Sequence, residues 1–185
     1  MALDPQPLET PSLLIRLFTP QDAPTMLVLS QEEPSRIWLP SQVYRDADHA
    51  RSAVEYLIAQ SLAPANPRLG PYVLAIEHRG DGALIGHVGF SALDDEVEIG
   101  FSIAQAYQGR GLATEALVAA SRWALEAFGL ERILGITAAA NIASKRALAR
   151  AGYVHQRDEM MNFQGTESMV SVYVLSRESG DEGGG

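Results

Sequence analysis

The feature that most constrains this 185-residue chain is a glycine-containing segment, Gln108–Glu115, between a predicted strand and a predicted helix. Residues 97–103 before it alternate with a period of two, as a strand with two different faces does. Residues 111–128 after it place apolar side chains at helical spacing. The glycines keep the turn uncrowded, so consecutive backbone N–H groups can point at one anion, and the helix adds free N–H groups and the positive end of its dipole. The segment is predicted to cradle a pyrophosphate, with Arg110 as a cation beside it.

Commoner nucleotide-binding loops do not fit, because the segment has no G-x-G-x-x-G and no following Lys-Ser/Thr pair. The alternative is a surface turn that only connects two elements. Strand, loop and Ala-rich helix together resemble motif A of the GNAT acetyltransferases, whose signature Gln/Arg-x-x-Gly-x-Gly/Ala is matched by Gln108, Gly111 and Ala113. In that family this loop binds the pyrophosphate of acetyl-CoA. The resemblance therefore implies acetyl-CoA as cosubstrate, held by Gln108, Gly109, Arg110, Gly111, Leu112, Ala113 and Thr114.

Composition narrows the class of protein. The absence of cysteine excludes a disulfide framework, a thiolate metal site and a cysteine nucleophile. The net charge of −9 argues against general nucleic-acid binding and is compatible with a cationic amine as substrate, although many proteins are acidic only for solubility. No apolar run is long enough to span a membrane, and the N-terminus lacks the layout of a signal peptide. A soluble, cytoplasmic protein with no membrane partner is expected.

The order of predicted elements is strand, two helices, three strands, helix, strand, helix and two strands, which is typical of an α+β fold. It matches the GNAT order, so we expect a single GNAT-type domain over residues 11–176, with a mixed, largely antiparallel sheet of about seven strands flanked by about four helices. Residues 1–10 are predicted to be an extended lead-in and 177–185 a disordered tail. Strands are predicted over 13–18, 72–77, 83–91, 97–103, 132–137, 154–160 and 168–175. Helices are predicted over 21–31, from Asp46 or Asp48 to about 62, over 111–128 and over 142–150.

The start of the chain narrows the resemblance. Leu13-x-Ile15-Arg16 with Asp22-Ala23 resembles the RimJ/RimL-like branch, which acetylates protein N-termini and various small amines. The acceptor implied is therefore a protein N-terminus, notably on a ribosomal protein, or an amine-bearing small molecule. Members of this branch are monomers or homodimers, and no feature of this sequence chooses between the two.

A second cluster begins at Asn141, which precedes a predicted helix and fits a helix N-cap. Its spacing to Ser144 and to Gly152-Tyr153 resembles GNAT motif B, in which the Asn contacts the pantetheine arm. Both roles are compatible, because the side chain has donors and an acceptor. Many GNATs carry a tyrosine general acid at the position of Leu148, so that acid is absent here. Ser144 matches a serine to which the branch assigns a related role, and its alternative role is to satisfy helix-terminal backbone groups.

Glu98 is the predicted general base. An amine must be neutral to attack a thioester, and a carboxylate that takes its proton helps at neutral pH. Glu98 lies in Val-Glu-Ile-Gly-Phe, which matches the Glu-x-Gly-Tyr/Phe pattern of the branch. Alternation places Glu96 on the same face, as a weaker candidate, whereas an ordinary role for Glu98 is a solvated or ion-paired carboxylate. The resemblance further implies that a bulge splays this strand and that Phe101, Ser102 and Ile103 pair with pantetheine.

The acceptor site has the weakest sequence signal. The resemblance places it in the segments 30–45, 62–71 and 160–168, and Trp38 and Tyr44 with Glu98 are the predicted substrate-binding residues, although Trp38 fits a core role equally well. The four histidines show no metal-ligand spacing, His87 being the one pocket candidate, and no metal is expected. The function expected is direct acetyl transfer from acetyl-CoA to a primary amine. The alternatives are a non-catalytic acyl-CoA-binding regulatory module and a purely structural domain.

Overall fold

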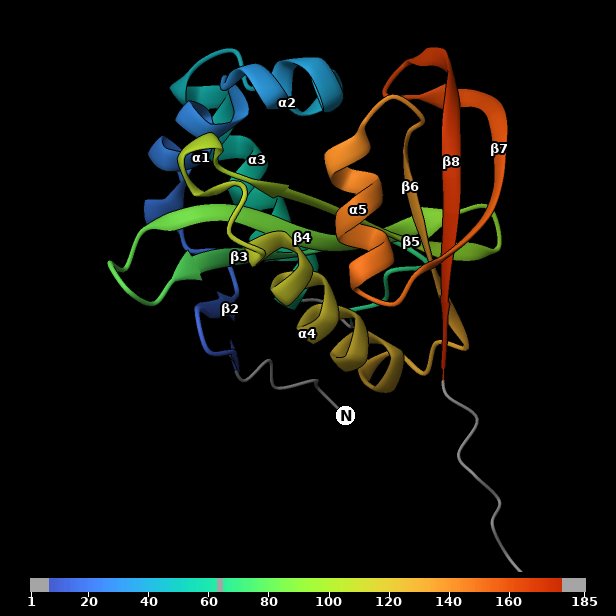
Figure 1. Cartoon of the computed structure of the whole chain (residues 1–185). Coiled ribbons are helices and arrows are strands. Elements are labelled where there is room, and N and C mark those ends of the chain that lie inside the picture. The colour runs from blue at the N-terminus through green and yellow to red at the C-terminus, as the bar shows by residue number, and fades with distance from the viewer. Residues whose placement is uncertain (1–6, 63–64, 178–185) are drawn as a thin grey trace, which may run out of the picture.

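The computed structural model describes residues 7–62 and 65–177, which form one mixed sheet of eight strands with helices on both faces (Figure 1). The strand order is β1-β2-β3-β4-β5-β6-β8-β7, and every neighbouring pair is antiparallel except β5 and β6. Because β5 and β6 are parallel, the chain must cross over between them, and a helix makes that crossing. The strands are β1 (Leu8–Glu9), β2 (Leu13–Arg16), β3 (Tyr72–His78), β4 (Leu84–Leu93), β5 (Glu96–Ile103), β6 (Arg132–Ala138), β7 (Val154–Phe163) and β8 (Thr166–Ser176).

Alternating side chains along β3 show how the two faces of the sheet are covered. Tyr72, Leu74 and Ile76 pack into the main hydrophobic cluster with helix α4, whereas Val73 and Ala75 pack on the opposite side with α1 and α3. The described helices are α1 (Ala23–Ser30), α2 (Glu33–Trp38), α3 (Ala47–Leu62), α4 (Leu112–Ala127) and α5 (Ile142–Arg150), with the 3₁₀ turns η1 (Pro20–Asp22), η2 (Pro40–Gln42) and η3 (Gln105–Tyr107). None of these helices is both long and apolar enough to span a bilayer.

Helix α4 is fixed on the sheet by a stripe of small and apolar side chains. Ala116, Ala120 and Ala124 are fully buried, and their small size lets the helix approach the strands closely. Near its C-terminal end, the rings of Trp123 and Phe128 lie 5.4 and 5.2 Å from the ring of Tyr72. This packing holds the helix axis, and with it the direction of the N-terminal turn.

Strands β5 and β6 separate soon after they meet, as Figure 1 shows. Only two residue pairs join them, Glu98 with Leu134 and Ile99 with Gly135. The expected bulge is not present, because β4 and β5 pair in continuous register from Glu96 to Ile103. The two strands diverge instead, so beyond Ile99 the edge of β5 that faces β6 is not paired with it.

The predicted fold class is confirmed, with eight strands and five α-helices in the described residues instead of about seven and four. Two elements were not predicted. Leu8–Glu9, within the expected lead-in, pairs with β2, and Glu33–Trp38, expected as a loop, is helix α2. Residues 1–6 and 178–185, which carry most of the predicted lead-in and tail, lie outside the described residues.

Candidate active site

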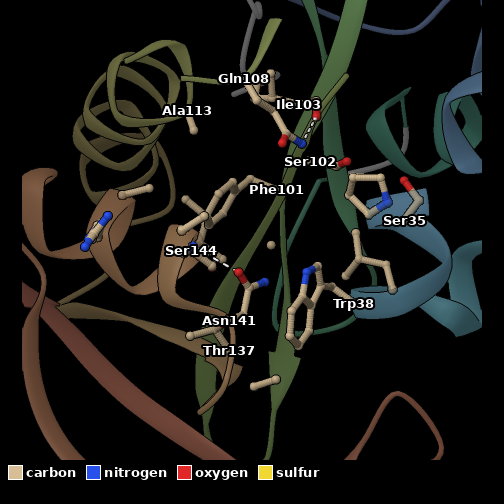
Figure 2. Close-up of a pocket in the computed structure, with 18 of the residues that line it drawn as sticks. Ser35, Trp38, Phe101, Ser102, Ile103, Gln108, Ala113, Thr137, Asn141 and Ser144 are labelled. Carbon is tan, nitrogen blue, oxygen red and sulfur yellow. Dashed lines mark hydrogen bonds between the residues drawn. The ribbon is translucent and has the colours of Figure 1, made fainter. Parts of the chain in front are cut away.

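A cavity of about 450 Å³ opens where β5 and β6 separate (Figure 2). One end is formed by the segment 108–114, which we call the cofactor loop, and by β5 and α5. The other end is formed by α2, η2 and the turn between β7 and β8. Segments from four distant parts of the sequence therefore meet around one space.

The cofactor loop directs backbone N–H groups into this cavity. Gly111 is the N-cap of α4 and adopts a left-handed conformation, with φ of 77°, that glycine reaches without strain. Residues 111–114 all line the cavity, and within the part of the chain that the structure describes their N–H groups have no hydrogen-bond acceptor. The first N–H bonded inside the helix is that of Glu115, which donates to the carbonyl of Gly111 at 3.1 Å. The free N–H groups and the helix dipole make this end of the cavity an anion site.

The space beside the loop glycines fits a phosphate. A Cβ atom built on Gly109 or Gly111 would meet no atom within 4 Å, so the face of the loop is clear of protein. Both residues have positive φ, so the backbone turns there in a way that L side chains rarely adopt. An open approach next to consecutive N–H groups is the geometry that a pyrophosphate needs.

The side chains of the cofactor loop differ in direction. Gln108 Nε2 donates to the carbonyl oxygen of Ile103 at 3.0 Å, which ties the loop to the end of β5. Arg110 does not line the cavity; its guanidinium donates to the carbonyl of Ala106 at 3.1 Å and lies 5.1 Å from the ring centre of Tyr107. The predicted contact of Arg110 with pyrophosphate therefore requires a change of its rotamer.

Two other arginines line the cavity and were missed by the sequence interpretation. Arg146 and Arg150 lie one helical turn apart on α5, beside the exposed or partly exposed cavity-lining residues Ala143 and Ser144. Their side chains are exposed, so they are free to pair with anionic groups in the cleft between α5 and the cofactor loop. The i, i+4 spacing is the one signal the sequence offered, and it is equally typical of a solvated helix face.

The start of α5 confirms the N-cap prediction for Asn141. Its Oδ1 atom accepts a 3.2 Å hydrogen bond from the backbone N–H of Ser144, and both residues line the cavity (Figure 2). Because the cap uses only the oxygen, the side-chain NH₂ group keeps its donors for a ligand. Cap and ligand contact are thus compatible at one residue.

The position that carries a tyrosine acid in many GNATs is part of the core here. Leu148 is 1% exposed, is not among the residues that line the cavity, and packs against the backbone of Gly135. Tyr153 is also buried, and its hydroxyl forms a 2.7 Å hydrogen bond with that of Ser121 on α4. Ser144 is therefore the hydroxyl of motif B that reaches the cavity.

Glu98 lies on β5 with its side chain in the cavity wall. Burial raises the pKa of its carboxyl group above the ordinary value, and the hydroxyl of Ser91, its cross-strand partner, acts in the opposite direction. Glu96 does not line the cavity and is ion-paired with Arg132 instead. A partly buried carboxylate with a raised pKa is suited to accept a proton near neutral pH.

A family model for the acetyltransferase (GNAT) domain matches residues 12–154. The chain belongs to the GNAT acetyltransferase family. It is 28% identical over 173 residues to YoaA, an uncharacterized N-acetyltransferase of Bacillus subtilis (strain 168), and the match covers 91% of this chain and 95% of YoaA.

Solved structures share the GNAT fold. A GNAT-family acetyltransferase from Bacillus anthracis superposes with a TM-score of 0.79 at 19% identity, over 94% of this chain and 100% of that one. RimL, a ribosomal L7/L12 alpha-N-protein acetyltransferase solved with coenzyme A, superposes with a TM-score of 0.76 at 17% identity, over 92% and 98%. These superpositions show that the chain shares their fold.

The acceptor end of this GNAT domain contains one of the two predicted aromatic residues. Trp38 lines the main cavity (Figure 2), whereas Tyr44 lines a neighbouring space of about 20 Å³ together with His87. Of the three segments expected to form the acceptor site, 30–45 and 160–168 contribute to the cavity, and none of the described residues of 62–71 does. Residues not singled out by the sequence are Ser35, Leu39, Gln42, Phe163 and Gln164. Within residues 7–62 and 65–177, no group of His, Asp and Glu side chains is placed to hold a metal ion.

Proposed function

We propose that this protein transfers an acetyl group from acetyl-CoA directly to a primary amine. The observation that carries the proposal is that free N–H groups at the start of α4 open into the same cavity as Glu98. An anion site and a base in one continuous space suit a reaction between a phosphate-bearing donor and an amine.

The residues present fit acetyl-CoA along the whole cleft. The cofactor loop would hold the pyrophosphate, and Arg146 and Arg150 would pair with phosphate groups that extend beyond it. The open side of β5 at Phe101–Ile103 would pair with the amides of pantetheine, as an added strand does, and Asn141 would contact the same arm. When bound, acetyl-CoA supplies the acetyl group as a reactive thioester.

Two residues of this chain, Glu98 and Ser144, would assist the proton transfers. Glu98 would take a proton from the acceptor ammonium, directly or through a water molecule, so that the neutral amine is presented. Ser144 would donate a hydrogen bond to the sulfur atom of the departing CoA thiol. A thiol pKa of roughly 8.5 means that little acid assistance is needed there, which is consistent with a buried leucine at position 148.

The relatives suggest the kind of acceptor. RimL is described as an alpha-N-protein acetyltransferase of ribosomal L7/L12, so a protein N-terminus is one candidate and a small-molecule amine the other. We place the reaction in the cytoplasm, with the protein acting as a monomer or homodimer.

Calorimetric titration with acetyl-CoA tests the first half of the proposal, with desulfo-CoA and ADP as controls. Saturable binding at one site is expected, and absence of binding to folded protein would overturn the function. Thiol release in the presence of amines then tests transfer. The buried Leu148 favours one alternative, a non-catalytic acyl-CoA-binding module, which predicts binding without thiol release for any amine.

A further inference from the structure

We propose that the acceptor is a primary amine that carries no charged group besides the reacting amine. An example is the α-amine of an amino acid whose carboxyl group is blocked as an amide. The inference rests on the proposed acetyl transfer and specifies its acceptor. It follows from the charges that line the two ends of the cavity.

The acceptor end contains a single ionisable group among the described residues. That group is Glu98, which the reacting ammonium itself requires. The rest of the wall at this end is neutral, made of aromatic rings, hydroxyls and carboxamides: Trp38, Phe163, Ser35, Ser91, Gln42 and Gln164. The two arginines that line the cavity, Arg146 and Arg150, lie on α5, towards the cofactor loop.

The walls of the acceptor end are joined to each other. Ser41 in η2 donates a hydrogen bond to the side-chain oxygen of Gln164 in the β7–β8 turn, although 123 positions separate them in the sequence. Their neighbours Gln42 and Phe163 line the cavity from opposite sides. This link joins the two walls through a solvent-exposed contact, so their neutral side chains face one space.

A second charge on the acceptor would find no compensating partner among the side chains that line this end. An ionised group taken from water into a protein interior is destabilised unless an opposite charge or several hydrogen bonds compensate it. A second ammonium would compete with the first for Glu98, and a free carboxylate would find no cation at this end. An amide or hydroxyl body, in contrast, can exchange hydrogen bonds with Gln42 and Gln164.

The surface and the cavity therefore act on the acceptor in different ways. The net charge of −9 attracts cationic amines of every kind to the protein. The cavity accepts one ammonium at Glu98 and selects against further charge. Discrimination among amines is then expected when they bind in the cavity, and not in their long-range attraction to the protein.

Three acceptors of nearly equal size test the inference: alaninamide, free alanine and 2,3-diaminopropionamide. They differ in having no second charge, a carboxylate or a second amine. We expect kcat/KM, corrected for the fraction of neutral α-amine, to be at least about tenfold higher for alaninamide than for either of the others. Equal use of the three, preference for a charged one, or transfer to none by protein that binds acetyl-CoA would overturn the inference. Failure to bind acetyl-CoA would instead remove the proposed function.

A charge variant gives an independent measurement. Gln42→Glu places a carboxylate in the acceptor end and is expected to shift the preference towards 2,3-diaminopropionamide by about tenfold or more. Gln21→Glu, on the exposed turn η1 away from the cavity, adds the same charge and controls for the change in net charge. The same shift in both variants would contradict selection by the cavity.

Discussion

The hydroxyl of Tyr107 donates a 2.6 Å hydrogen bond to Oδ2 of Asp81, and thereby joins η3 to the β3–β4 turn. Asp81 Oδ1 lies 3.0 Å from Nδ1 of His78 and accepts the backbone N–H of Ala83 at 3.1 Å. These hydrogen bonds hold the pKa of Asp81 at about 2, so the carboxylate persists throughout the neutral range. Because the cofactor loop follows Tyr107 directly, and Tyr107 itself lines the cavity, this contact fixes the start of the loop.

The Tyr107→Phe substitution removes that contact while keeping the ring. We expect the Kd for acetyl-CoA, measured by calorimetry, to rise about 3- to 10-fold, as for the loss of one hydrogen bond. Asp81→Asn weakens the same contact without altering a residue of the cavity and should raise Kd in the same direction. Asp95→Asn, on the exposed β4–β5 turn, is the matched control, and an equal effect there would show that only net charge matters.

Gly111→Val is expected to abolish measurable binding of acetyl-CoA, or to weaken it at least tenfold. A left-handed conformation costs an L residue roughly 1–2 kcal/mol, and the new side chain would occupy the clear face of the loop. Gly129→Val imposes comparable strain, at a φ of 59° and with open space around it, at the other end of α4. If both variants lost affinity equally while remaining folded, the loop would not be the phosphate site.

The cofactor end was largely predictable because its signals are local in sequence. Gly111 and Asn141 are each defined by their place between neighbouring elements, and each forms the N-cap of the helix that follows. The direction of Arg110 was not predictable, since it depends on packing over the Tyr107 ring.

The acceptor end was predictable only as broad segments, for a physical reason. Gln42 and Gln164 become neighbours of one cavity only after the β7–β8 hairpin has packed beside η2, and neither residue has a local pattern that distinguishes it from a surface glutamine. Helix α2 was missed because Pro34 suggested a loop, whereas proline is tolerated in the first turn of a helix, where it lies. Tertiary contacts decide this end of the site.

Glu98→Gln should lower kcat/KM by about 100-fold near pH 7, as expected for the loss of a general base. In the wild type, activity should fall as the pH drops through the pKa of Glu98, which burial raises, because the protonated carboxyl cannot accept a proton. The deficit of the variant should shrink at high pH, where the amine is already neutral. Glu96→Gln, two residues away and outside the cavity, should keep the wild-type profile. A Glu98→Gln profile identical to the wild type would exclude Glu98 as the base.

His87 is expected to make stability depend on pH. Burial lowers its pKa to about 4, below an ordinary value near 6.5, so between these values the unfolded chain binds a proton that the folded chain does not. The free energy of unfolding should therefore decrease as the pH falls from 6.5 towards 4, by at most about 3 kcal/mol from this residue. Urea unfolding at several pH values measures it, and His87→Gln should lose less stability on acidification than the wild type. Parallel curves for the wild type and His87→Gln would mean that His87 is protonated equally in both states.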